Sequence, residues 1–486
     1  MRLSEYAQYD AVGLAELIAT KQISVKEATE LAVAGVESVN ERLNAVVEIF
    51  PDRTDGPLRN EVEKGALFGV PILNKDISFA EAGRVQEMGS LFTKGFVPRT
   101  NSTTVERLRK AGLNLLGRTT TPEFGISGIT ESEIAGTTRN PWDIDRTPGG
   151  SSGGSTAMVA AGAVPVATAS DGGGSTRTPA SCCGLVGLKP TRGRVPVGPD
   201  RGEDSCGLVA HFAVSRSMRD CAAFLDILSG PASGDSYVIQ APTEAYASVV
   251  AEPPPKLRIA FTDQNWAGVS TSGESRQALR LALHCLQSAG HVLEEATPPI
   301  EWASFFEATI TVMCAKLAYS VDSLSAVLGC SPGPENLQSS TWCYRFGRSC
   351  SAANFLSALG KFNEVNRIVG RFFQQYDVFA TPTNVYPAPL LESCYSCNPS
   401  DPIEAADYLA NVYANDLFLA PFNTTGQPAI TLPLFQTEDD LPLGVHFVGR
   451  FGDEKTLLQL GSFFEKACPW NHRLPPVHVG SSDGVS

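Results

Sequence analysis

The sequence predicts an α/β fold, because short apolar segments typical of buried strands alternate with segments of helical pattern along the chain. The composition supports a large core, since 43% of the 486 residues are hydrophobic and 19% are charged. A chain of this length often forms two or three domains, but large α/β enzymes also reach it around one sheet. Alternation and composition therefore indicate the fold class and leave the number of domains open.

The N-terminal part is expected to begin with an amphipathic helix. Ser24 and Glu27 form the pattern of a capping box, in which each side chain satisfies a free N–H group at the helix start. Apolar residues then recur at helical spacing to about Asn40, which is typical of a helix packed on one face. The run 66–76 has a strand pattern and ends on Lys75 and Asp76. A lysine at the end of such a run is unusual, because buried lysines need a partner or a purpose.

The stretch 147–180 is rich in glycine and serine. It holds one serine-bearing glycine turn at Ser151 and Ser152 and a second at Ser175, separated by a small-residue helix and a short apolar strand. Glycine lets the backbone turn tightly and bring several N–H groups to one place, as an oxyanion site requires. A flexible linker is the alternative, but linkers stay polar and the middle of this stretch is apolar. The stretch therefore predicts a catalytic site.

The alternation continues to the C-terminus. The segment 302–370 is mainly helical in pattern and is expected to cap a site, residues 231–255 are expected to connect two lobes, and the tail from Pro475 is expected to be loose. Further helices are expected at 103–111, 215–230 and 275–289, and further strands at 113–116, 185–190, 256–261, 376–382, 429–434 and 444–449.

Charge and cysteine content disfavour several classes of function. The net charge of −14 disfavours a nucleic-acid partner or binding to anionic lipid, since both need basic patches. The N-terminus lacks the pattern of a secretory signal and no run of about 18 apolar residues is present, so we expect a cytoplasmic protein that does not bind a membrane. The twelve cysteines are then expected to be reduced. Cys394 and Cys397 form a C-x-x-C pair, but without a second pair a zinc or redox role is disfavoured.

Ser175 is the better candidate nucleophile on the residues alone. The pattern G-x-S-x-G occurs twice within 149–154, but a nucleophile elbow needs a strand directly before the serine, and residues 140–148 are loop-like. A Ser-His-Asp enzyme would also need one of only six histidines as its base. Ser175 follows a strand-like run, and each oxyanion donor beside it would contribute about 3 kcal/mol in the transition state. The expected donors are the backbone N–H groups of Gly172, Gly173, Gly174 and Ser175.

Six segments, in this order, resemble the amidase signature family of serine hydrolases. They are GVPILNKD, FGISGITESEIAGTTRNPWD, TPGGSSGGSTAMVAAG, DGGGSTRTPASCCGLVGLKPT, YDVFATPT and FNTTGQPAITLPL. The resemblance spans nearly the whole length. It implies a single amidase domain over 1–486, built on one large mixed sheet with helices on both faces, with 302–370 as a helical cap. It also implies catalysis without a metal or an organic cofactor.

The resemblance implies a Ser-cis-Ser-Lys triad as well. The matching positions make Ser175 the nucleophile, Ser151 the bridging serine after a cis peptide bond and Lys75 the base, with Ser152 as a structural neighbour. To accept a proton Lys75 must be neutral, so its pKa has to fall from about 10.4 to about 7 or 8, a change that burial can supply. We therefore expect Lys75 to be buried and neutral.

Other motif positions match supporting roles in the family. Asp171 and Arg177 match residues expected to support the glycine turn structurally. Gly125 and Ser127, in FGISG, match a stretch that lines the site in relatives. Cys314 is a further candidate for contact with substrate, with core packing as the alternative.

The segments 214–237 and 441–470 look most like the bacterial branch that holds nylon-oligomer (6-aminohexanoate cyclic dimer) hydrolases and aryl acylamidases. This branch implies hydrolysis of a small, largely uncharged amide that is linear, cyclic or aromatic, and a homodimer is compatible with it. One position departs from the family pattern, since Gly172 stands where relatives have a larger residue, which predicts a more mobile turn or a roomier acyl pocket. The alternatives are the glutaminase subunit of a tRNA-dependent amidotransferase and a catalytically silent binding protein.

Overall fold

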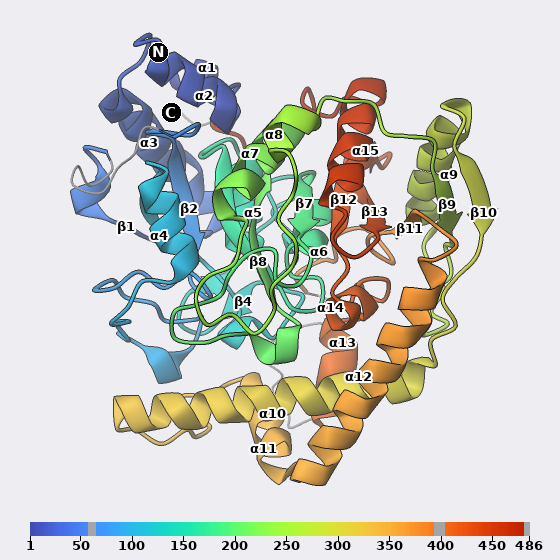
Figure 1. Ribbon diagram of the computed structural model, residues 1–486. Helices are drawn as coiled ribbons and strands as arrows, with labels where there is room; N and C mark the ends of the chain where they lie inside the picture. Colours follow the sequence, from blue (N-terminus) through green and yellow to red (C-terminus); the bar gives the residue numbers. More distant parts are fainter. Residues whose placement is uncertain (57–64, 393–403, 481–486) are drawn as a thin grey trace.

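A central sheet of eleven strands runs through the molecule (Figure 1). The computed structural model describes residues 1–56, 65–392 and 404–480. Within them the strands lie in the order β1 (Val46–Ile49), β3 (Asn114–Thr119), β2 (Pro71–Lys75), β6 (Val166–Asp171), β8 (Ala210–Ser215), β7 (Val186–Lys189), β12 (Ala429–Gln436), β13 (Pro442–Gly449), β11 (Val378–Pro382), β9 (Arg258–Phe261) and β10 (Val292–Glu295). A small ribbon consists of β4 (Glu131–Ser132) and β5 (Gly136–Thr137).

The large sheet mixes parallel and antiparallel pairs. β2 is parallel to both β3 and β6, and β9 is parallel to β10 and β11. The pairs from β6 through β8, β7, β12 and β13 to β11 are antiparallel, as is the pair of β1 and β3. Because the carboxyl ends of β2 and β6 meet at one edge, Lys75 at the end of β2 lies beside Ser170 near the end of β6.

Helices cover both faces of the sheet, as neighbouring residues of β11 illustrate. Side chains alternate between the faces of a strand. Val378 and Ala380 pack in the core that includes α9 (Gly273–Ser288) and α15 (Glu454–Ala467). Phe379 packs in another core with α12 (Ala352–Phe372) and α14 (Pro421–Thr425). The predicted α/β fold with one large mixed sheet is confirmed.

The other helices connect and cover these strands. They are α1 (Leu3–Tyr6), α2 (Ala11–Ala19), α3 (Val25–Leu43), α4 (Thr103–Lys110), α5 (Gly153–Ala160), α6 (Arg177–Cys183), α7 (Met218–Leu228), α8 (Tyr246–Val249), α10 (Trp302–Leu328), α11 (Ser340–Ser349) and α13 (Ala405–Val412).

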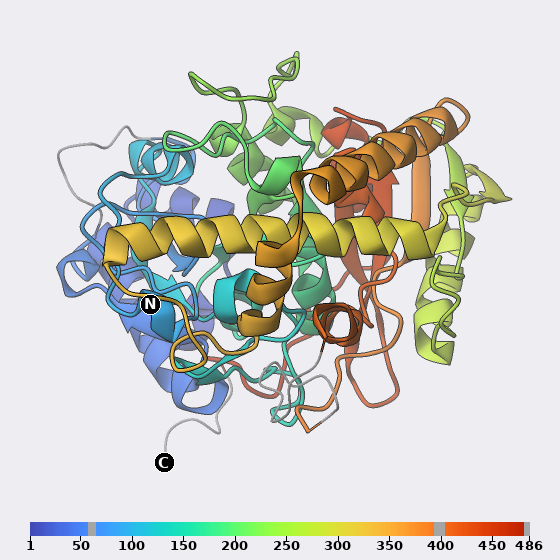
Figure 2. The same cartoon turned by 90° about the horizontal axis from the view of Figure 1, so that it is seen from below.

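Three helices, α10, α11 and α12, lie together below the sheet in the view of Figure 1, and α10 runs across the molecule in the view from below in Figure 2. Phe305 of α10 packs against Phe362 of α12 with ring centroids 6.3 Å apart. The length and composition of α10 alone would allow it to cross a membrane, a test that apolar core helices also pass. The segment 302–370 is therefore mainly helical and lies at one end of the sheet.

One expectation near the N-terminus needs correction and another is confirmed. Ser24 Oγ accepts a hydrogen bond from Glu27 N–H at 3.0 Å, as expected of the cap of this helix, and the Glu27 carboxylate also binds the Met1 amino group at 2.8 Å. The strand predicted at 66–76 is confirmed only over β2 (Pro71–Lys75), since residues 66–69 form a turn.

The C-terminal tail is fixed as far as residue 480, so the expectation of a loose tail from Pro475 is wrong for this part. Val477 and Val479 are buried, and the Val479 N–H donates to the Ala161 carbonyl at 2.9 Å. Apolar contacts with the core thus hold a segment that has no regular secondary structure. The C-x-x-C pair of Cys394 and Cys397 lies outside the described residues.

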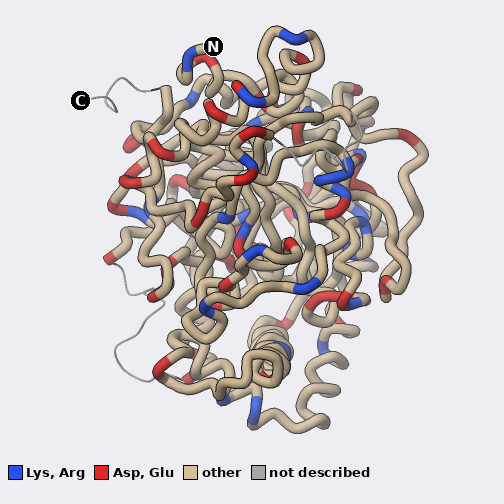
Figure 3. The backbone as a smooth tube through the Cα atoms, turned by 90° about the vertical axis from the view of Figure 1, so that its left-hand side faces the viewer, with Lys and Arg blue, Asp and Glu red and all other residues tan. Residues whose placement is uncertain are grey.

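Charged residues are dispersed over the molecule. Figure 3 shows basic and acidic positions interspersed along the backbone on the side that faces the viewer. Some form ion pairs between distant segments, such as Arg219 with Asp10 at 2.6 Å. The absence of a nucleic-acid partner stays a prediction.

Candidate active site

Lys75 stands at the carboxyl end of β2 and is buried, with 1% of its surface exposed. Its backbone N–H donates to Thr168 Oγ1 at 2.9 Å, which fixes this end of β2 against β6. Its Nζ lies 2.8 Å from Ser151 Oγ, 2.9 Å from Ser152 Oγ and 3.1 Å from Ser170 Oγ. Three hydroxyl groups, which can both donate and accept, therefore surround the amine.

Burial lowers the pKa of Lys75 to about 7, against the opposing attraction of the Asp171 carboxylate. A charged amine loses its hydration when it is buried, so burial favours the neutral form. The expectation of a buried lysine is confirmed. At neutral pH a large share of the molecules carries Lys75 as a free amine, which can accept a proton.

Ser151 lies in the loop that leads into α5. The peptide bond between Gly150 and Ser151 is cis, as the resemblance implied. The Ser151 carbonyl accepts a hydrogen bond from Thr121 Oγ1 at 2.9 Å, and the Gly149 carbonyl accepts one from Thr130 Oγ1 at 2.8 Å. Two threonines of the preceding segment therefore hold this loop in place.

Ser175 lies in the turn between β6 and α6 and is 6% exposed. The Ser152 N–H donates to the Ser175 carbonyl at 3.2 Å, so the two serine turns lie side by side. Gly174 has a φ of +147°, a backbone conformation that residues with a side chain rarely adopt. Among the described residues, no acceptor binds the backbone N–H groups of residues 172–175. Four consecutive donors are thus available, as an oxyanion site requires.

A buried ion pair closes this turn. Arg177 Nε lies 2.9 Å from Asp171 Oδ2, and Arg177 Nη2 lies 2.9 Å from Asp171 Oδ1. Asn423 Nδ2 donates to the Asp171 carbonyl at 2.8 Å, and His446 Nε2 lies 3.1 Å from Arg177 Nη1. Burial raises the pKa of Asp171, but the Arg177 guanidinium, the Asn423 amide and Lys189 together lower it more, so the pKa lies well below its usual range. Asp171 therefore stays ionised and ties the end of β6 to the start of α6.

The three residues predicted to contact substrate, Gly125, Ser127 and Cys314, lie at different distances from the serine pair. The Cβ position on Gly125 lies 3.3 Å from Ser151 Oγ, so Gly125 borders the serine pair. Ser127 is buried in the same loop, and its Oγ accepts from Ile129 N–H at 3.1 Å. Cys314 is fully buried in the apolar core between α10, α11 and α13. Substrate contact by Gly125, Ser127 and Cys314 stays a prediction.

Three neighbours of the centre were not assigned to it from the sequence. Ser152, expected only as a structural neighbour, contacts Lys75 Nζ as closely as Ser151 does. Ser170 also contacts this atom, and its place near the carboxyl end of a strand that precedes a glycine turn is the local signal for its position. Tyr413 follows α13, and its ring lies 3.5 Å from the Cβ position on Gly173. No local pattern indicates Tyr413.

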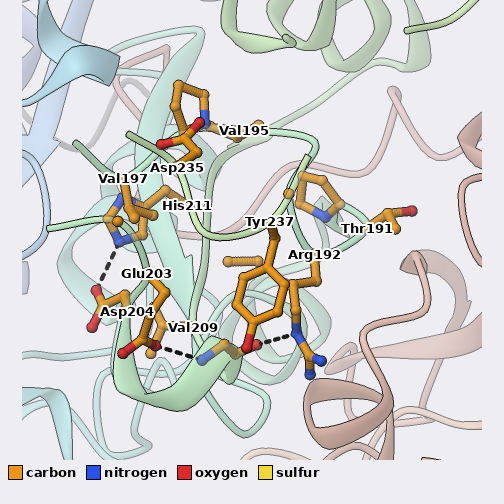
Figure 4. A pocket seen from close by; sticks show the side chains of 16 residues that line it. Thr191, Arg192, Val195, Val197, Glu203, Asp204, Val209, His211, Asp235 and Tyr237 are labelled. Atoms are coloured by element: carbon orange, nitrogen blue, oxygen red, sulfur yellow. Dashed lines mark hydrogen bonds and ion pairs between the residues drawn. The ribbon is translucent and has the colours of Figure 1, made fainter. Parts of the chain in front are cut away.

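A small hollow with about 30 Å³ of free space is lined by residues between Pro190 and Tyr237 (Figure 4). One wall carries Arg192, whose guanidinium stacks over the Tyr237 ring at 5.2 Å. Another wall carries Val209, whose Cγ2 lies 3.0 Å from the Cβ position on Gly172. Neither Lys75 nor the serines around it line the hollow, so it adjoins the centre without containing it.

Comparison with known proteins agrees with this geometry. The Amidase family model matches residues 27–458 of the chain. The chain belongs to the amidase signature family. The 6-aminohexanoate-cyclic-dimer hydrolase of Paenarthrobacter ureafaciens is 33% identical to this amidase over 478 residues, which cover 96% of each chain. The 6-aminohexanoate-cyclic-dimer hydrolase of Pseudomonas sp. (strain NK87) is 34% identical over 477 residues, again with 96% of each chain covered.

Solved structures agree with this assignment. A structure of 6-aminohexanoate cyclic dimer hydrolase has a TM-score of 0.91 to this amidase at 32% identity, with 97% of this chain and 99% of that chain covered. A bacterial aryl acylamidase shares the fold, with a TM-score of 0.84 at 23% identity over 96% of this chain and 98% of its own. The protein is an enzyme that hydrolyses amide bonds.

The buried ion pair gives a prediction about the stability of the amidase. Arg177→Met is expected to lower the free energy of unfolding by about 3–5 kcal/mol, because it leaves the Asp171 carboxylate buried without its partner. Urea unfolding measures this change. Arg219→Met is the control, since Arg219 pairs with Asp10 at 2.6 Å but is 52% exposed, and its loss should cost below about 1 kcal/mol. Equal effects of the two substitutions would contradict a supporting role for Arg177.

The glycine turn gives a prediction about activity. Gly174→Ala is expected to lower kcat by about 10²–10³-fold, the effect of losing an oxyanion donor. The added Cβ would lie 2.8 Å from Leu419 Cδ1, in a backbone conformation with φ +147°. The matched control is Gly172→Ala, whose Cβ would meet only the Val209 methyl group at 3.0 Å, so a loss below about tenfold is expected. Measured kcat values that fall in the reverse order would contradict the assigned turn.

Proposed function

We propose that this amidase hydrolyses a small, largely uncharged carboxylic amide through an acyl-enzyme on Ser175, with Ser151 as the proton bridge and Lys75 as the base. The observation that carries the proposal is the 2.8 Å contact between Lys75 Nζ and Ser151 Oγ in a buried centre, where the pKa of the lysine is about 7. A neutral amine beside a hydroxyl can take up a proton through it. The free N–H groups of residues 172–175 support the same proposal.

Acylation begins when Ser175 Oγ attacks the carbonyl carbon of the amide. The Ser175 proton passes to Ser151, and the Ser151 proton passes to Lys75. The N–H groups of residues 172–175 bind the negative oxygen that forms. When the C–N bond breaks, the proton returns from Lys75 through Ser151 to the leaving amine. Water then attacks the ester, gives its proton to the same relay and releases the acid and Ser175.

The apolar core beside the glycine turn supports the proposal that the substrate is uncharged. The core between α10, α11 and α13 consists of apolar side chains such as Ile310 and Leu317, and the partly buried Tyr413 connects it to the glycine turn at Gly173. An ionised group in such surroundings would lose its hydration without a partner. The relatives named as hydrolases of 6-aminohexanoate cyclic dimer support a cyclic amide or its linear counterpart.

A substrate screen tests the proposal. Purified amidase is incubated with 6-aminohexanoate cyclic dimer, short linear amides, anilides and glutamine, and the released amine or ammonia is measured. We expect hydrolysis of at least one uncharged amide with a kcat/KM far above that for glutamine. A preference for glutamine would favour the alternative of a glutaminase subunit. A folded protein without activity on any uncharged amide would contradict the proposal.

The cap gives a further prediction. Exchange of residues 302–370 for the matching segment of the Paenarthrobacter ureafaciens relative is expected to change the ratio of kcat/KM between two amides by about tenfold or more, as a change of a few contacts in an apolar pocket can do. The labelling rate of Ser175 by a small fluorophosphonate serves as the control and should change little. An unchanged substrate ratio in a folded chimera would show that these helices do not set specificity.

A further inference from the structure

Cys285 and Cys468 are neighbours in space, with their Sγ atoms 3.5 Å apart, although 183 positions separate them in the sequence. Cys285 lies on α9, and Cys468 caps the C-terminus of α15. Both side chains are half-buried. We propose that this pair is a redox-sensitive modification site, in which the two thiols are oxidised to a disulfide that joins α9 to the end of α15.

The backbones on both sides are held by contacts that do not involve sulfur. His291, which follows α9, packs edge-on against Phe463 of α15 with ring centroids 6.3 Å apart. Beyond Cys468, Trp470 is buried and its Nε1 donates to the Arg216 carbonyl at 2.9 Å. A disulfide needs sulfur atoms about 2 Å apart, so the two atoms have to approach by about 1.5 Å, which side-chain rotation can supply.

Contact and access together distinguish this pair from Cys314, Cys343 and Cys330. Cys314 and Cys343 are also neighbours, but both are fully buried in the apolar core of α10 and α11. Cys330 is exposed, but it follows the C-terminal end of α10 and is not next to a second thiol among the described residues. A disulfide reagent needs a thiol that is both reachable and next to a second thiol, and Cys285 with Cys468 meets both conditions.

The oxidation balances with a small disulfide such as oxidised glutathione. The thiolate of one cysteine attacks a sulfur of the reagent, which gives a mixed disulfide and one glutathione thiolate. The thiolate of the second cysteine then attacks the protein sulfur of the mixed disulfide and releases the second glutathione. The two protons of the cysteines pass to the two glutathione thiolates. Burial, together with the adjacent Cys285 thiol, raises the pKa of Cys468, so the reaction should be faster in alkaline solution.

The bond is expected to change stability and leave catalysis unaffected. α9 and α15 pack in the core on one face of the sheet, whereas α12 packs in the core on the other, and the residues around Lys75 contact neither α9 nor α15 through hydrogen bonds. A cross-link that closes so long a loop restricts the unfolded chain. The oxidised amidase should therefore unfold at a higher temperature than the reduced one.

Peptide mapping tests the proposal. Full-length amidase is incubated with oxidised glutathione at about pH 8, the remaining thiols are alkylated, and the protein is cut with trypsin and a glutamate-specific protease. Cleavage separates the peptide 281–294, with Cys285, from Cys314, and releases the peptide 467–473, with Cys468. We expect these two peptides to be recovered joined, and to separate after treatment with dithiothreitol. Recovery of both as alkylated or glutathionylated monomers would overturn the proposal.

Matched variants give a second readout. The rise in Tm on oxidation should disappear in Cys285→Ser and in Cys468→Ser and persist in Cys330→Ser, where an exposed cysteine is replaced. The kcat for an amide substrate should be equal in the oxidised and reduced wild-type protein. A rise in Tm that persists in Cys285→Ser, or joined peptides that involve Cys330 of a second copy, would also contradict the proposed pair. The mapping of the wild-type chain does not depend on whether a variant folds.

Discussion

Ser175→Ala is expected to lower kcat/KM for amide hydrolysis by about 10⁴-fold or more, the loss found when serine hydrolases lose their nucleophile. In the proposed mechanism, Ser175 Oγ forms the bond to the acyl group, so alanine leaves only water as a nucleophile. The fold should persist, because the change removes one hydroxyl group at a site that is 6% exposed. Initial rates with an anilide measure the loss, and thermal unfolding verifies the fold.

The two serines beside Lys75 provide a graded comparison. Ser151 Oγ lies 2.8 Å and Ser152 Oγ lies 2.9 Å from Lys75 Nζ, so distance alone does not identify the proton bridge. If Ser151 carries the proton, Ser151→Ala should lose far more activity than Ser152→Ala. Labelling by a fluorophosphonate should vanish in Ser175→Ala and persist in Ser152→Ala. Wild-type activity or labelling in Ser175→Ala would remove Ser175 from the mechanism.

The parts of the site that the sequence could predict depend on local patterns. A lysine at the end of an apolar strand and a serine after a glycine run are visible within about ten residues, and Lys75 and Ser175 occupy such positions. The family resemblance supplied the position of Ser151 and its cis peptide bond. The fold class followed from alternation, since a strand that is buried on both faces is apolar throughout.

The parts that could not be predicted depend on contacts between distant segments. Asn423 and His446 contact the pair of Asp171 and Arg177, but more than 240 positions separate them from Arg177. Tyr413 reaches the glycine turn from the loop after α13. Such contacts follow from how the sheet brings β6, β12 and β13 together, and no short pattern encodes that order.

Lys75→Met is expected to lower kcat/KM by about 10²–10⁴-fold, the usual contribution of a general base. The wild-type rate should also depend on pH. Burial lowers the pKa of Lys75 to about 7, so below this pH the lysine is protonated and cannot accept a proton. The wild-type kcat/KM should therefore rise as the pH increases through about 7 and then level off. In Lys75→Met this rise should be absent. If the activity of Lys75→Met equals that of the wild type at every pH, Lys75 is not the base.

The substitution Lys75→Met should also change how the free energy of unfolding depends on pH. The pKa of Lys75 is about 7 in the folded protein and 10.5 ordinarily, so between these values the unfolded chain binds more protons than the folded one. Burying Lys75 therefore costs on the order of 5 kcal/mol below pH 7, and this cost falls to zero as the pH rises to about 10.5.

Burying methionine does not carry this pH-dependent cost. The hydrogen bonds between Lys75 Nζ and the serines around it are absent from the variant at every pH. The difference in unfolding free energy between Lys75→Met and wild type should thus favour the variant more at about pH 6 than at about pH 10. Urea unfolding at both pH values measures it. A difference that does not vary with pH would mean that Lys75 keeps its ordinary pKa when buried, and a lysine that stays protonated at neutral pH cannot be the base. The pH dependence of activity and that of stability therefore test the protonation state of Lys75 independently.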